Sequence, residues 1–125
     1  MTIEQLTADT FDATIERGIV LVDLWAAWCG PCRAFAPIFE AAAARHPTVQ
    51  FAKVDTDAEQ VLAGELGVAA IPTLMAFRDG IIVFSQAGVL PAKAIDSLIA
   101  QIAALDMDAI RREVAAAIDP PGATL

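Results

Sequence analysis

The chain has 125 residues, of which 57% are hydrophobic and 19% are charged, and its formal net charge is −8. This length fits one domain with a core of its own, and the apolar composition excludes a largely disordered chain. Eight basic residues do not supply the Lys/Arg surface that phosphate contact requires, so we expect no nucleic-acid partner. No stretch reaches the roughly eighteen consecutive apolar residues of a membrane span, so we expect no membrane partner.

Hydrophobic periodicity and turn residues predict the elements of the N-terminal half. In chain order we expect a short strand over 2–6, a helix from a Thr7 cap to Gly18, a strand over 19–25, a helix ending near Arg45, a strand over 48–54 and a helix from an Asp57 cap to about Leu66. The 19–25 run is apolar almost throughout, which is typical of a strand buried on both faces.

The C-terminal half predicts a hairpin and then helices. Strands over 73–78 and 81–86 meet at Asp79-Gly80, which is a strong hairpin signal. A helix follows from Pro91 to Leu105, and a second apolar stripe at helical spacing continues at Met107, Ile110, Val114 and Ile118.

Strand–helix–strand followed by a hairpin predicts an α/β fold. We expect a central mixed sheet of four to five strands with helices on both faces and an extra C-terminal helix. Residues 1–105 form the expected domain, and residues 106–125 form an expected C-terminal helical extension with a loose tail.

The two cysteines of the chain, Cys29 and Cys32, lie where the 19–25 strand gives way to a helix. Unpaired N–H groups and the helix dipole at such a position lower a thiol pKa from its ordinary value of about 8.5. Pro31 suits the first helical turn, where its missing N–H costs little. The spacing predicts an exposed attacking sulfur at Cys29 and a more sheltered resolving sulfur at Cys32.

The cysteine pair has two alternative interpretations, a zinc site and a structural disulfide. Structural zinc needs four ligands, and the chain offers the two cysteines and His46, so only a zinc site shared between two chains stays open. A structural disulfide that closes so small a loop would stabilise little. The first residues have no signal-peptide pattern, so we expect a cytoplasmic location, where a close Cys pair is typical of catalysis or metal binding. Redox chemistry is therefore favoured.

The residues around the cysteine pair resemble the thioredoxin family. The matching segments are Val20–Arg33, Ala36-Pro37, Ala52–Asp55, Ile71–Thr73, Phe77, Asp79-Gly80 and Ala87-Gly88. The resemblance covers roughly residues 6 to 105. It implies a thioredoxin fold and a protein-disulfide reductase that works by dithiol–disulfide exchange.

The resemblance also implies catalytic roles. Cys29 would be the nucleophile, Cys32 the resolving thiol, Asp23 a buried proton acceptor for Cys32, and Lys53 the partner of that carboxylate. Burial should raise the pKa of Asp23 toward neutrality, which suits a general base. The plainer alternatives are a hydrogen-bonded core carboxylate at Asp23 and a surface lysine at the end of the sheet. Arg33 replaces a lysine that is common in the family, and little change is expected because the charge is kept.

A substrate surface follows from the same resemblance. Its expected members are Trp28, Gly30, Pro31, Ile71, Pro72, Thr73 and Gly88. Pro72 should be cis, and the backbone of Ile71 should pair with an extended substrate segment. For Gly88 an ordinary turn glycine is an equal alternative, and for Trp28 ordinary rim packing is one.

We expect no metal and no bound cofactor, because the Cys29–Cys32 disulfide is itself the redox group. The implied partners are a thioredoxin reductase, which would supply electrons from NADPH, and disulfide-containing clients. A monomer is expected, with a dimer through residues 106–125 as the alternative. A dedicated redox partner of one client, or a non-catalytic binding module whose specificity the extension sets, are the competing functions.

Overall fold

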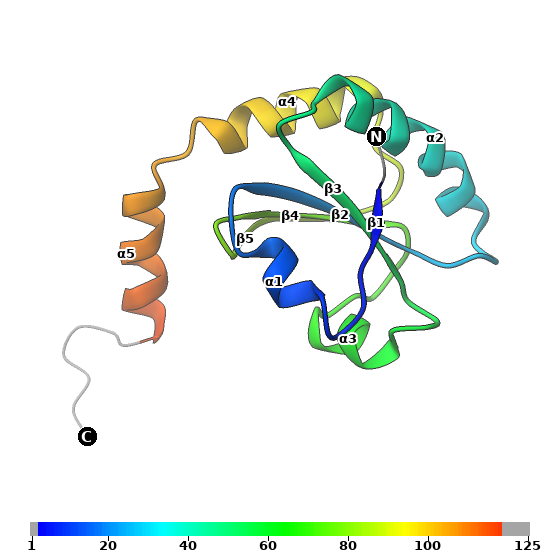
Figure 1. The fold of residues 1–125 in the computed structure, drawn as a ribbon, viewed down its shortest axis with the longest axis horizontal. Helices are drawn as coiled ribbons and strands as arrows, with labels where there is room; N and C mark the ends of the chain where they lie inside the picture. Colours follow the sequence, from blue (N-terminus) through cyan, green and yellow to red (C-terminus); the bar gives the residue numbers. More distant parts are fainter. Residues whose placement is uncertain (1–2, 119–125) are drawn as a thin grey trace.

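The computed structural model describes residues 3–118 (Figure 1). Its elements are β1 (Glu4–Gln5), α1 (Phe11–Ile15), β2 (Ile19–Trp25), α2 (Gly30–Arg45), β3 (Gln50–Asp55), α3 (Gln60–Glu65), β4 (Thr73–Arg78), β5 (Ile81–Ala87), α4 (Ala92–Ala103) and α5 (Met107–Ile118). The expected loose tail falls on residues 119–125 and lies outside the described residues.

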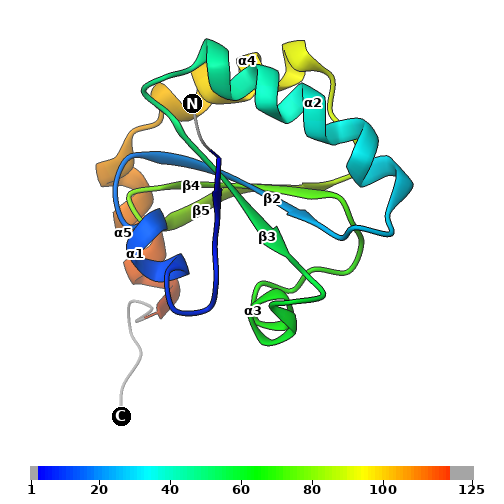
Figure 2. The ribbon, with the colours of Figure 1, turned by 45° about the vertical axis from the view of Figure 1, so that its right-hand side comes forward.

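The five strands of the described chain form one mixed sheet in the order β1-β3-β2-β4-β5. β3 pairs in parallel with both β1 and β2, whereas β4 pairs antiparallel with β2 and β5. Helices α2 and α4 cover one face of the sheet, and α1 and α3 lie on the other (Figures 1 and 2). The predicted α/β class and mixed sheet are therefore confirmed.

Strand β2 occupies the centre of the sheet because its side chains are apolar on both faces. Leu21 packs with the α2 and α4 side chains, while Val20, Val22 and Leu24 pack with those of α1 and α3. All four are fully buried. Asp23 lies on the same face as Leu21, because successive side chains of a strand alternate. This alternation directs a carboxylate into the interior beneath α2.

Two predicted helix caps are wrong. Helix α1 begins at Phe11 and not after Thr7, because the Thr10 hydroxyl accepts the Thr7 N–H at 2.9 Å and closes a turn first. Helix α3 begins at Gln60, and the turn before it is held by Asp55, whose carboxylate accepts two backbone N–H groups. Asp57 is directed elsewhere, as described below.

Helix α5 follows α4 after a short bend at the end of the molecule opposite the N-terminus of α2 (Figure 1). The Arg78 guanidinium donates to the carbonyl oxygens of Ile102, Ala103 and Leu105 at 2.7, 3.2 and 3.3 Å. Arg111 of α5 forms an ion pair of 3.3 Å with Asp79. The β4–β5 turn thus holds the junction of α4 and α5.

None of the helices within residues 3–118 combines the length and the apolar character that crossing a membrane would need.

Candidate functional site

Cys29 and Cys32 form a disulfide at the N-terminus of α2. Cys29 is the N-cap residue of α2 and has an extended backbone. Its Sγ accepts a hydrogen bond from the Cys32 N–H, with 3.2 Å between sulfur and nitrogen. A sulfur in this position meets the unpaired donors and the positive end of the helix dipole, which favour a thiolate once the bond is reduced. The expected exposed sulfur at Cys29 is not seen in the disulfide form. The two residues are 4% and 3% exposed, because Trp25, Ala26 and Ile71 pack around them.

The loop before β4 lies against this disulfide. The Ile71 carbonyl oxygen is 3.8 Å from Cys29 Sγ, and the Ile71–Pro72 peptide bond is cis, as the resemblance implies. Pro72 is buried, and its carbonyl accepts the Gly88 N–H at 2.8 Å. Gly88 has a φ of 102°, a conformation that L side chains rarely adopt, so a glycine is required here by the backbone.

Asp23 and Lys53 are direct neighbours in the pairing of β2 with β3. Asp23 is 1% exposed, and neither of its carboxylate oxygens accepts a hydrogen bond from the described residues. Burial raises the pKa of Asp23 to about 6, although the positive charge of Lys53 opposes that rise. The alternative of a hydrogen-bonded core carboxylate therefore does not fit the described contacts.

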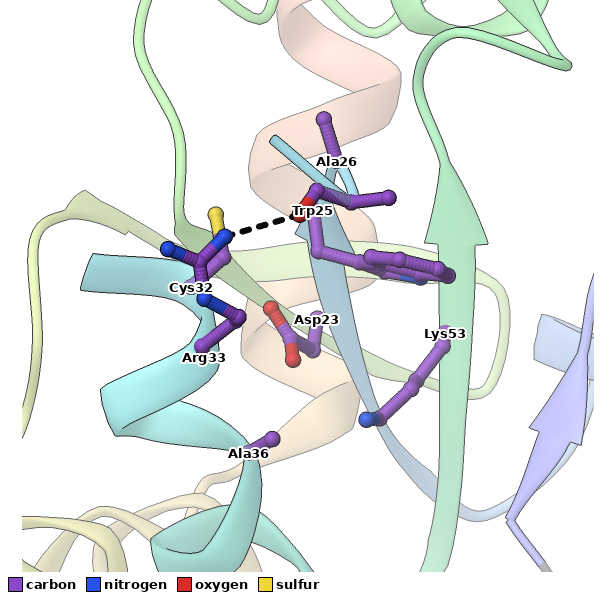
Figure 3. Close-up of a pocket in the computed structure, with 8 residues that line it drawn as sticks. Asp23, Trp25, Ala26, Cys32, Arg33, Ala36 and Lys53 are labelled. Atoms are coloured by element: carbon purple, nitrogen blue, oxygen red, sulfur yellow. Dashed lines mark hydrogen bonds between the residues drawn. The ribbon is translucent and has the colours of Figure 1, made fainter. Parts of the chain in front are cut away.

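A cavity of about 130 Å³ is lined by both Asp23 and Cys32 (Figure 3). It is lined by Asp23, Trp25, Ala26, Ala27, Cys32, Arg33, Ala36 and Lys53. The Asp23 carboxylate points into it between α2 and β3, and Lys53 enters from the β3 side with Nζ 5.9 Å from the centre of the Trp25 ring. A carboxyl group with a pKa of about 6 thus lines the same cavity as the second cysteine.

Comparison with known proteins identifies the family. A sequence model of the Thioredoxin family matches residues 2–101. The Streptomyces coelicolor protein named "Putative thioredoxin 2" is 46% identical over 112 residues. These residues are 89% of this chain and 84% of that relative. The thioredoxin of Bacillus subtilis is 38% identical over 100 residues, 79% of this chain and 96% of its own.

The chain belongs to the thioredoxin family. Its structure agrees, since the thioredoxin of Malassezia sympodialis superposes with a TM-score of 0.73 at 30% identity, over 81% of this chain and 93% of that one. A thioredoxin-family chain with this Cys-x-x-Cys pair is a thiol–disulfide oxidoreductase and a protein-disulfide reductase, and its redox group is the disulfide itself. Its substrates as a class are proteins with disulfides, and the family works with a reductase partner. Helix α5 lies beyond the residues that the family model matches.

Among residues 3–118, no group of three or more His, Cys, Asp and Glu side chains is placed to hold a metal ion. His46, the third zinc ligand considered from the sequence, instead lies at the C-cap of α2, where its Nε2 is 2.6 Å from Asp96. The hydrogen bonds from His46, and then those from Arg45, lower the pKa of Asp96.

The structure brings together the residues expected around the disulfide and adds two contacts that sequence reasoning missed. The exposed Trp28 donates its indole N–H to Asp57 at 2.9 Å. Arg33 Nη1 donates to the Ala27 carbonyl at 2.9 Å (Figure 3). An acidic residue soon after the second central strand and an arginine after the second cysteine were the available signals. The sequence predicts a helix cap at Asp57 and a cation equivalent to lysine at Arg33, and it contains no local sign of the partner that the fold supplies to each.

Proposed function

We propose that Cys29 is the nucleophile of this thioredoxin-family protein and that Cys32 is its resolving thiol. The observation that carries the proposal is the position of Cys29 at the N-cap of α2, where its Sγ accepts the Cys32 N–H. Of the two sulfurs, this is the one that the helix N-terminus favours as a thiolate, and the thiolate is the attacking form.

The reaction follows from these roles. The Cys29 thiolate attacks one sulfur of a client disulfide, a mixed disulfide forms and the other client sulfur leaves as a thiolate. Cys32 then attacks Cys29 Sγ, which breaks the mixed disulfide, releases the reduced client and leaves the Cys29–Cys32 disulfide. Two electrons pass from the protein to the client.

Asp23 is proposed as the base that accepts the Cys32 proton. Its pKa of about 6 makes it mostly ionised at pH 7 and able to take a proton without a large energetic cost. Lys53 is proposed to keep the carboxylate in this range, because its charge counters the effect of burial. The cavity that both Cys32 and Asp23 line supports this proposed proton transfer.

The client is proposed to bind across the Ile71–Pro72 loop and Trp28. The Ile71 backbone, whose carbonyl oxygen lies 3.8 Å from Cys29 Sγ, is placed where an extended segment could pair with it beside the reactive sulfur. Trp28 is 69% exposed and offers an aromatic contact next to the reactive sulfur. Gly30, Pro31, Thr73 and Gly88 complete the proposed surface.

The oxidised protein is proposed to be recharged by a thioredoxin reductase that draws electrons from NADPH. This places the protein in cellular electron transport and redox homeostasis in the cytoplasm. A reducing compartment fits a redox pair that must be returned to the dithiol after each turnover.

We propose a domain boundary near residue 105, with residues 106–125 as an extension that leaves a monomer. The family match that ends at residue 101 supports the boundary. Truncation after Leu105 tests whether the extension acts. Unchanged activity, unfolding and sedimentation would exclude a role in turnover, stability or dimerisation, whereas lost activity toward one client alone would support a dedicated redox partner.

Reduction of a test disulfide protein, coupled to a thioredoxin reductase and NADPH, tests the whole proposal. We expect turnover by the native chain and none by Cys29→Ser. Cys32→Ser should accumulate the mixed disulfide with the client, which mass spectrometry detects. A mixed disulfide on Cys32 in the Cys29→Ser variant, at the rate of the native chain, would reverse the two roles.

A further inference from the structure

Arg33 makes two hydrogen bonds to the segment that carries Cys29. Its backbone N–H donates to the Cys29 carbonyl at 3.2 Å, as part of the first turn of α2. Its Nη1 donates to the Ala27 carbonyl at 2.9 Å. One residue of α2 therefore holds the chain on both sides of Trp28.

The bonded segment is otherwise a turn between β2 and α2. Ala27 and Trp28 are exposed, and one backbone hydrogen bond of 3.2 Å, from the Cys29 N–H to the Ala26 carbonyl, crosses it. The Trp28 indole adds a side-chain bond to Asp57, but a short exposed turn with one backbone bond across it is easily deformed. The guanidinium adds a charge-assisted bond to it from the rigid helix.

Arg33 also lies at the rim of the cavity that reaches Asp23. The cavity places Lys53 and the Trp25 ring on the β3 side and Arg33 with Ala36 on the α2 side (Figure 3). Ala36 is small, so the Arg33 side chain is the large group of α2 that lines this space. Arg33 and Ala27 are both exposed and both line the cavity, so the bond between them lies on its solvent side.

We propose that Arg33 is a positioning residue that fixes the Ala27–Cys29 turn and closes the rim of the Asp23 cavity. The inference rests on the proposed roles of Cys29 and Asp23. It differs from a role of charge alone, because a planar guanidinium donates to the Ala27 carbonyl in a fixed direction. The ammonium of a lysine is a compact, strongly hydrated point charge that does not reproduce this geometry.

Two consequences follow for a chain that lacks the guanidinium. A looser turn places the Cys29 sulfur less well for attack, so disulfide exchange slows. An open rim admits water to Asp23, so the pKa of this carboxyl moves down toward its ordinary value, because burial is the largest cause of its rise. The second consequence would not arise from a residue that only stabilises the fold.

Arg33→Lys and Arg33→Met distinguish a positioning role of the guanidinium from a role of its charge alone. Arg33→Lys keeps the positive charge but lacks the planar guanidinium. Arg33→Met keeps an apolar side chain of similar length but lacks the charge. Arg112→Lys is the matched control, because Arg112 lies exposed on α5. Three measurements apply to each reduced protein: the rate of attack on a small aromatic disulfide, the Asp23 titration by carboxyl ¹³C NMR, and urea unfolding.

Both Arg33 variants are expected to react about fivefold more slowly and to lower the pKa of Asp23, whereas Arg112→Lys matches the native chain. Native behaviour of Arg33→Lys with a defect in Arg33→Met alone would show a role of charge and overturn the proposal. An unmoved Asp23 titration in both variants, with only weaker folding, would also overturn it. If the proposed roles of the cysteines failed, Cys29→Ser would react with the small disulfide at the native rate, and the Asp23 titration of the Arg33 variants would still report on the cavity.

Discussion

The indole N–H of Trp28 donates to the carboxylate of Asp57 at 2.9 Å and so joins the active-site turn to the segment before α3. Trp28 is 69% exposed, far more than an aromatic side chain that packs in a core. The bond therefore holds a large apolar surface in one direction beside Cys29 while leaving its face open to a partner.

Asp57→Ala is expected to lower kcat/KM for a protein disulfide about fivefold, because a hydrogen bond of about 1 kcal/mol no longer fixes the Trp28 ring. Asp57→Asn is the matched control, since it keeps an acceptor oxygen at the same position. The coupled reductase assay and the tryptophan fluorescence anisotropy check the result. Equal kcat/KM in all three proteins would show that the orientation of Trp28 does not depend on Asp57.

The raised pKa of Asp23 predicts that folding stability depends on pH. A carboxyl with a pKa of about 6 in the folded protein and 3.8 in the unfolded chain binds its proton more tightly when folded. Its stabilising effect is complete below pH 3.8 and is lost as pH rises through 6. About two pKa units at 1.36 kcal/mol each correspond to about 3 kcal/mol.

Asp23→Asn removes this titration. Relative to the native chain, the free energy of unfolding of the variant should rise by about 2 to 3 kcal/mol between pH 4 and pH 8. Comparing two pH values cancels the constant cost of a buried amide. Urea unfolding of the disulfide form at both values provides the measurement. Parallel pH profiles for the two proteins would contradict the raised pKa.

Gly88→Ala is expected to destabilise the protein by about 1 to 3 kcal/mol, because its φ of 102° is unfavourable for any residue with a Cβ. A Cβ built at Gly88 meets nothing within 4 Å, so the cost lies in the backbone and not in a clash. Gly64→Ala in α3 also meets open space and has no such φ, so it should be neutral or stabilising. Equal effects of the two substitutions in thermal unfolding would refute the assignment to φ.

The sequence predicted the fold correctly at positions where a residue type is compatible with a single local environment. The apolar run of β2 required burial on both faces, and Asp79-Gly80 required a tight turn, for which the structure has positive φ at both residues. The prediction failed at Thr7, where the Thr10 hydroxyl accepts the Thr7 N–H and closes a turn first, and at Asp57, whose carboxylate accepts from a donor that the fold brings near. For Asp57 that donor is an indole 29 positions away, which no local pattern contains.

The same limit applies to the arginines. Arg33 follows the second cysteine and was read as a cation equivalent to lysine, yet its Nη1 bonds a carbonyl six positions earlier in the chain. Arg78 ends a predicted strand, and its partners lie at the end of a helix that begins fourteen residues later. A sequence gives the charge of such a side chain, but the direction of its donors depends on the packing of α4 against the sheet.

Arg78→Met is expected to loosen the junction of α4 and α5 without changing the active site, which lies at the other end of the sheet. The substitution removes a charged donor from three carbonyls at the C-terminus of α4, where a cation also complements the helix dipole. Hydrogen exchange at the Leu105 and Ile110 amides should become about tenfold faster, and disulfide reduction should keep its native rate.

Arg111→Gln is the control, because it breaks an exposed ion pair that contributes little to stability. It should accelerate amide exchange less than Arg78→Met does. Equal exchange in the two variants would show that Arg78 does not anchor the junction.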